Sequence, residues 1–92
     1  MAVAVVVDTP GATQELYDRT MEALRRRGVT LPVEGQILHL AGPYNGGWRT
    51  MDVWESREAN ERFFQEHLAP VFAETGVPPG QPQVMVVHGL YK

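Results

Sequence analysis

The segment from Trp48 to Ser56 constrains the fold more than any other part of this sequence. Trp48, Thr50, Asp52 and Trp54 recur at every second position, as in a strand whose side chains point alternately to its two faces. Ser56 occupies the position of a helix N-cap, and the apolar residues after it recur at helical spacing. The segment therefore predicts a strand that leads directly into a helix. An aspartate between two tryptophans also indicates that this strand face borders a cavity with polar groups in its wall.

The length and composition indicate one small domain that spans residues 1–92. The chain has no cysteine, which excludes disulfides and thiolate metal sites. Its three histidines lack the spacing of the common zinc motifs, so we expect no metal site. The formal net charge is −3, and the one basic run, Arg25–Arg27, closes a predicted helix. We therefore expect no nucleic-acid partner.

The N-terminal run from Met1 to Val7 is apolar but too short to cross a bilayer. It also lacks the basic lead-in and the cleavage site of a signal peptide, so we expect a cytoplasmic protein without a membrane partner. Within this run, Val3–Val7 has no polar side chain on either face, which predicts a strand at the centre of its sheet.

The order of the predicted elements defines the fold class. Hydrophobic spacing and turn residues predict strands over 3–7, 36–40, 48–54 and 84–90, and helices over 13–27 and from 57 to about 68. Pro70 predicts that a kink or a short separate turn follows, through Thr75. Loops are expected over 41–47 and 76–82, and Pro10 is expected in the first turn of the first helix. The order β-α-β-β-α-β predicts a ferredoxin-like α+β fold with a four-stranded antiparallel sheet and both helices on one face. The uncovered face predicts a homodimer.

These residues also resemble a known family. Val53-Trp54-Glu55-Ser56, followed by Phe63-Phe64, is similar to the strand-to-helix signature of the dimeric α/β-barrel proteins, and more narrowly of the antibiotic biosynthesis monooxygenase-like group. The resemblance implies a homodimer closed as a barrel, with a ligand cavity between each sheet and its helices. Activities in the group include cofactor-free oxygenation of anthrone-like phenols, haem degradation, lactone isomerisation and polyketide cyclisation. Haem degradation is set aside because the first strand lacks asparagine and Phe63 replaces a tryptophan.

His39 and Asp52 are the predicted catalytic pair. In a hairpin centred on Tyr44-Asn45, Thr50 lies opposite His39, and Asp52 is a diagonal neighbour roughly 7–8 Å away on the same face. A carboxylate there would fix the imidazole tautomer and raise its basicity, which makes a general base. The alternative is an exposed edge histidine, with the aspartate bonded to Arg49 or to the backbone.

The predicted substrate-binding residues surround this pair. Aromatic walls are expected from Trp48, Trp54 and Phe63, because flat rings hold an aromatic ligand by stacking. Tyr44, Asn45 and Arg49 are expected to anchor its polar groups. The alternatives are an ordinary core position for Trp54 and a simple turn for Asn45-Gly46.

The leading hypothesis is a cofactor-independent monooxygenase that acts on an aromatic or polyketide-like substrate and needs no cofactor. A cyclase or isomerase on the same scaffold, and a non-catalytic dimer that binds a small hydrophobic ligand or a partner protein, are the alternatives. An open cavity lined by both His39 and Asp52 favours the enzyme, whereas a filled interior favours the non-catalytic dimer.

Overall fold

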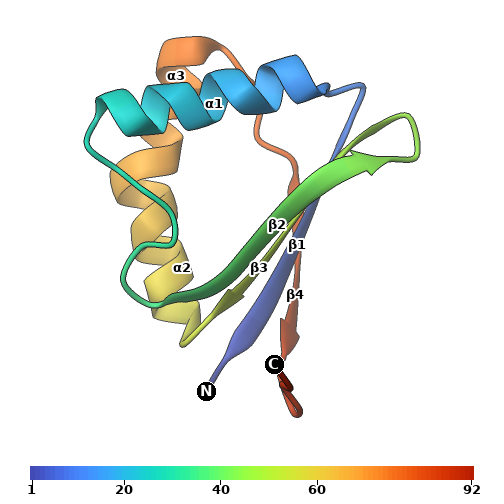
Figure 1. Ribbon diagram of the computed structural model, residues 1–92, viewed down its shortest axis with the longest axis vertical. Helices are drawn as coiled ribbons and strands as arrows, with labels where there is room; N and C mark the ends of the chain where they lie inside the picture. The colour runs from blue at the N-terminus through green and yellow to red at the C-terminus, as the bar shows by residue number, and fades with distance from the viewer.

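The computed structural model describes residues 1–92 as one four-stranded sheet with all helices on the same side of it (Figure 1). The strands are β1 (Val3–Pro10), β2 (Gln36–Tyr44), β3 (Gly47–Trp54) and β4 (Gln81–Val86). The helices are α1 (Gln14–Arg26), α2 (Arg57–Phe63), the π-helix η1 (Phe64–Leu68) and α3 (Ala69–Thr75), and the last three follow one another without a break. None of them has both the length and the apolar character needed to cross a membrane. The predicted ferredoxin-like α+β class and element order are confirmed.

The strands lie in the order β2-β3-β1-β4, and each neighbouring pair is antiparallel. β1 is flanked by β3 and β4, which confirms the central position predicted from its valines. Val3 and Val5 are buried on the helix side of the sheet. Ala4 and Val6 alternate with them and keep part of their surface exposed. The outer face of β1 is therefore not fully covered within one chain.

Thr13 and the predicted cap Ser56 are the N-caps of the two helical segments. Thr13 Oγ1 accepts a hydrogen bond from Leu16 N at 3.3 Å, and Ser56 Oγ accepts one from Ala59 N at 3.1 Å. Each such cap contributes roughly 1 kcal/mol, because it satisfies a backbone donor that has no partner inside the helix. Ser56 follows β3 after one residue, so its cap also sets where the chain leaves the sheet.

The core joins the sheet to both helical segments. Trp54, Leu24 and Val71 are its largest fully buried side chains, and they come from β3, α1 and α3. The whole cluster consists of nine buried apolar residues: Val3, Val5, Ala23, Leu24, Val29, Trp54, Ala59, Phe63 and Val71. Each layer is thus tied to the others by apolar contacts, the dominant stabilising term in a domain of this size.

The connection between β2 and β3 is shorter than the sequence predicts. A loop is expected over 41–47, but β2 continues to Tyr44 and only Asn45 and Gly46 form the turn. Their φ angles are 50° and 72°, and the type I′ hairpin turn needs positive values at both positions. Asn-Gly is the dipeptide that adopts this turn most readily, so the connection is a two-residue turn and not a loop over 41–47.

Two other predicted boundaries were wrong. The last strand was predicted over 84–90, but β4 runs from Gln81 to Val86. Pro82 is tolerated there because β4 lies at the edge of the sheet. Pro10 ends β1 and does not begin a helix, because α1 starts after the Thr13 cap.

The second helical segment does not end near Leu68. In η1 the turn widens, and Ala69 N donates to Phe64 O. The chain then continues as α3 to Thr75, with Pro70 in its first turn, where the missing N–H costs least. The irregularity predicted from Pro70 is present, but it lies before the proline and does not break the helix. Single π-turns of this kind occur frequently at functional sites.

Candidate active site

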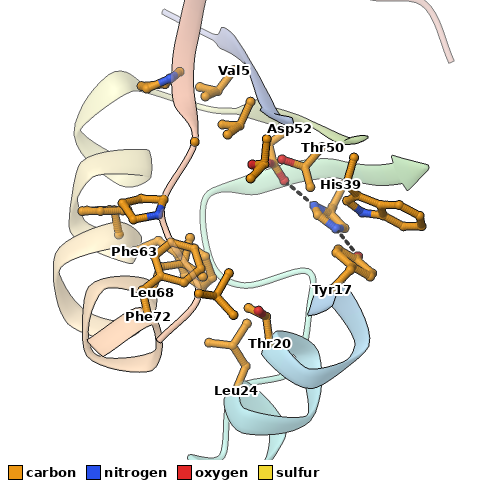
Figure 2. A pocket seen from close by; sticks show the side chains of 18 of the residues that line it. Val5, Tyr17, Thr20, Leu24, His39, Thr50, Asp52, Phe63, Leu68 and Phe72 are labelled. Carbon is orange, nitrogen blue, oxygen red and sulfur yellow. Dashed lines mark hydrogen bonds and ion pairs between the residues drawn. The ribbon is translucent and has the colours of Figure 1, made fainter. Parts of the chain in front are cut away.

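A cavity of about 520 Å³ lies between the helices and the inner face of the sheet (Figure 2). Its volume is within the range of small-molecule binding sites. Apolar residues from both layers form most of the wall, among them Val5, Leu24, Phe63, Leu68 and Phe72. Its polar side chains near β2 and β3 are Tyr17, Gln36, His39, Thr50 and Asp52. The space is therefore open, as the enzyme hypothesis requires.

His39 and Asp52 form a direct hydrogen-bonded pair across β2 and β3. Nδ1 of His39 lies 2.6 Å from Oδ1 of Asp52, and the two side chains are only 17% and 16% exposed. The predicted register was wrong by two residues, because Thr50 pairs with Ala41 and Asp52 pairs with His39. The two-residue turn at Asn45-Gly46 causes the difference. A shift of two leaves the faces unchanged, so the pair shares a face as expected, and its members lie closer than expected.

Gln36 extends this pair toward the protein interior. Its Nε2 donates to Oδ1 of Asp52 at 2.8 Å, and its Oε1 accepts from Val33 N at 3.0 Å. Gln36 and His39 are three positions apart, which would put them on opposite strand faces in a regular strand. An irregularity between Gln36 and Leu38 adds one residue to β2, and both side chains consequently point inward.

Tyr17 completes the polar group from the helix side. Its hydroxyl lies 2.6 Å from Nε2 of His39, so α1 and the sheet are joined through the imidazole (Figure 2). Burial raises the pKa of the Tyr17 phenol, and the carboxylates of Asp52 and Asp18 raise it further. The hydroxyl therefore stays protonated over the physiological range.

The hydrogen bonds from Val33 through Gln36, Asp52 and His39 to Tyr17 form one series, in which each group has a defined role as donor or acceptor. Val33 N can only donate, so it occupies Oε1 of Gln36 and leaves Nε2 of Gln36 to donate to Asp52. The Asp52 carboxylate accepts from Nδ1–H of His39, and in the neutral form of the imidazole Nε2 is then the acceptor for the Tyr17 hydroxyl. Such an arrangement prepares Nε2 to take a proton.

The three predicted aromatic walls all line the cavity. The Trp48 ring lies 5.4 Å from the Tyr17 ring, and the Trp54 ring lies 5.4 Å from the Phe63 ring, measured between centroids. Trp54 also belongs to the core, so both interpretations of this residue apply. The buried indole Nε1 atoms of Trp48 and Trp54 have no hydrogen-bond partner in the protein. Contact of these rings with a ligand remains a prediction.

The three predicted polar anchors lie outside the cavity wall. Arg49 is on the outer face of the sheet, where Nε and Nη2 bind the two carboxylate oxygens of Asp8 at 2.7 and 2.8 Å. Its guanidinium also lies 3.8 Å from the centre of the Tyr44 ring. Asn45 is exposed in the hairpin turn. Neighbouring residues of a strand point to opposite faces, so Arg49 points away from the face that carries Trp48. Tyr44 belongs to the longer β2 and points to the outer face as well. None of the three predicted anchors therefore faces this cavity.

The Asp8–Arg49 pair is a charged cluster at one end of the outer face. The hydrogen bond from Arg49 lowers the pKa of Asp8, and the pair raises the pKa of Arg49 in turn. Asp8 therefore keeps its charge to a lower pH than an isolated aspartate does. Elsewhere, no three histidine, cysteine, aspartate or glutamate side chains come together as a set of metal ligands.

Sequence reasoning missed Tyr17 and Gln36. Tyr17 lies within the helix predicted over 13–27 and Gln36 begins the strand predicted over 36–40, and neither was predicted to be a site residue. The sequence does not show that the helix face with Tyr17 lies over His39, because that depends on how the helix packs on the sheet. Nothing in the local pattern reveals the extra residue in β2 that turns Gln36 inward.

Comparisons with known proteins identify the fold. No protein-family model and no curated protein matches the chain. One similar structure is a provisionally named antibiotic biosynthesis monooxygenase from Chloroflexus aurantiacus J-10-fl. The alignment covers 100% of this chain and 98% of that protein, with a TM-score of 0.66 and 13% sequence identity. Another is a mutant of SnoaB, a cofactor-independent oxygenase from Streptomyces nogalater. The alignment covers 97% of this chain and 94% of SnoaB, with a TM-score of 0.58 and 13% sequence identity. The chain has the fold of the antibiotic biosynthesis monooxygenases.

A conserved protein from Methanosarcina mazei Go1 is also similar in structure to this chain, with a TM-score of 0.62 and 17% identity over 92% of this chain and 91% of the other. The resemblance inferred from Val53–Ser56 is therefore confirmed for the fold. Identities of 13–17% carry no reaction with them, so the chemistry has to be argued from the site.

The burial of Tyr17 predicts a phenol that resists ionisation. We expect an alkaline titration followed by tyrosinate absorbance to contain a component above about pH 10, the ordinary tyrosine pKa. That component should be absent from the Tyr17→Phe variant and present in the Tyr91→Phe control, because Tyr91 is exposed. A Tyr17 component at or below about pH 10 would contradict the described environment.

Proposed function

We propose that this chain is a small-molecule enzyme that removes a proton from an aromatic or polyketide-like substrate, with cofactor-independent oxygenation as the specific reaction. The observation that carries the proposal is an imidazole held by a carboxylate in the wall of an open, mainly apolar cavity. The likeness in fold to SnoaB, a cofactor-independent oxygenase, supports the same reaction class.

The geometry suits general base catalysis. Asp52 holds His39 in the tautomer whose Nε2 is unprotonated, and it stabilises the imidazolium that forms when His39 takes a proton. Correctly placed bases of this kind contribute roughly 10²–10⁴-fold to a rate. Loss of a proton makes an anthrone-like phenol an electron-rich carbanion, and such a carbanion reacts with O₂ without help from a metal or flavin. The protein would need to supply only the base, the cavity and the orientation.

The same base could serve a cyclisation or an isomerisation, because both begin with a carbanion or enolate. The aromatic walls Trp48, Trp54 and Phe63 favour a flat, largely apolar ligand in each case. A non-catalytic ligand-binding protein would also have the cavity, but it would have no need for the ordered His39–Asp52 pair.

The reaction can be tested with a hydroxyanthrone as the probe. We expect the purified protein to consume oxygen and form the quinone, and His39→Gln and Asp52→Asn to lower kcat by roughly 100-fold or more with the probe still bound. His88→Gln is the matched control, because His88 is exposed and outside the cavity. Binding of the probe with no turnover above a protein-free blank would leave a non-catalytic binding protein. Equal turnover in all three variants would overturn His39 and Asp52 as the base.

We also propose that the chain forms a homodimer through the outer face of the sheet. Leu38, Leu40, Met51 and Met85 alternate with inward-facing residues and are 39–63% exposed. A group of large apolar side chains on one face of a small domain is typical of an interaction surface. A second copy of the chain would cover this face and close the barrel that the family resemblance implies.

Introducing a charge on this face should separate the subunits. We expect the unchanged chain to show twice its monomer mass by light scattering, and Leu40→Lys to shift the protein toward the monomer, because a dimer would bury that charge without a partner. Gln14→Lys adds the same charge at an exposed position of α1 and should leave the mass unchanged. A monomeric unchanged chain would contradict the proposal.

A further inference from the structure

Both ring nitrogens of His39 are already occupied. Nδ1 is bonded to Asp52 and Nε2 is bonded to the Tyr17 hydroxyl, each at 2.6 Å. An imidazole can take a proton only at a nitrogen with a free lone pair, and in neutral His39 that atom is Nε2. A ligand in the cavity therefore cannot reach the basic atom of His39 directly while Tyr17 keeps this position.

Tyr17 is held firmly where it stands. It lies inside α1, a helix of 13 residues, and its ring packs against Trp48 at 5.4 Å between centroids. The ring is also nearly parallel to the imidazole of His39, with 5° between their planes. Tyr17 itself lines the cavity, and its hydroxyl is bonded to His39. Figure 2 shows Tyr17 extending from α1 to meet His39 on the sheet.

We propose that Tyr17 is a catalytic residue that relays the proton from the substrate to His39, an inference that rests on the proposed function. As the O–H or C–H bond of the substrate breaks, its electron pair stays on the substrate and its proton moves to Oη of Tyr17. The original proton of Tyr17 moves to Nε2 of His39. The products are a substrate anion, a neutral Tyr17 and an imidazolium, so no proton is lost and no oxidant is needed in this step.

The surroundings of Tyr17 fit this role. The raised pKa of its phenol keeps the hydroxyl protonated at rest, so the proton needed by His39 is in place before a ligand binds. After the transfer, the hydroxyl carries the former substrate proton and can donate it in a hydrogen bond to the substrate anion. The Asp52 carboxylate, which also accepts from Gln36, balances the positive imidazolium.

The relay can be tested by equilibrium ionisation of a bound phenol. 4-Nitrophenol absorbs visible light only as the phenolate, so its ionisation can be measured in a buffer in which the free compound stays protonated. We expect the protein to bind it in the ionised form, with binding followed separately by tryptophan fluorescence. Tyr17→Phe should lower the ionised fraction relative to the neutral one by roughly tenfold or more, since the phenolate loses a charge-assisted hydrogen bond. Tyr91→Phe is the matched control, because it removes an exposed hydroxyl.

The outcomes separate the relay from the proposed function. Equal or greater ionisation in Tyr17→Phe would show that His39 meets the phenol itself, which overturns the relay and leaves the general base intact. Absence of binding, or binding without ionisation in the unchanged protein, would overturn the general base and the relay together. A crystal structure with 4-nitrophenol gives a second measurement that needs no variant. The phenolate oxygen should lie within hydrogen-bond distance of Tyr17 Oη, and a position beside Nε2 of His39 would overturn the relay.

Discussion

The hydrogen bond between Asp52 and His39 is the interaction on which the arrangement of the site depends. A carboxylate that is 16% exposed in a largely apolar cavity is costly unless its oxygens are paired, and Gln36 and His39 both bond to Oδ1. The pairing fixes the imidazole tautomer, and the tautomer determines that Nε2 accepts from Tyr17. One carboxylate on β3 thus orders groups from β2 and α1.

The two faces of the sheet carry different kinds of side chains. Along β3, Trp48 and Asp52 face the cavity, whereas Arg49 and Met51 face outward. The inner face carries the hydrogen-bonded residues Gln36, His39 and Asp52 together with the aromatic walls. The outer face carries exposed apolar side chains, with the Asp8–Arg49 pair at one end. A chain of 92 residues can thus hold a cavity on one face of its sheet and expose large apolar side chains on the other.

The elements and the shared face of His39 and Asp52 could be predicted because they depend on local rules. The strand period orders Trp48 to Trp54, and Ser56 caps the following helix whatever lies around it. The register of β2 and β3 could not be predicted without knowing the turn type at Asn45-Gly46. The inward orientation of Gln36 depends on an irregularity in β2 that no local sequence pattern indicates. Tyr17 depends on how α1 packs over the sheet, which is a property of the whole fold. Fold similarity at 13–17% identity supplies none of these details.

One series of hydrogen bonds links Val33 N through Gln36, Asp52 and His39 to Tyr17, and its direction depends on the tautomer of His39. The most direct test is nitrogen-15 NMR of the histidine rings in the unliganded protein at neutral pH, with His39 assigned by its absence from His39→Gln. We expect that Nδ1 of His39 carries the proton and that Nε2 is unprotonated and hydrogen-bonded. A proton on Nε2 with a bare Nδ1, or rapid averaging between the two forms, would contradict this direction.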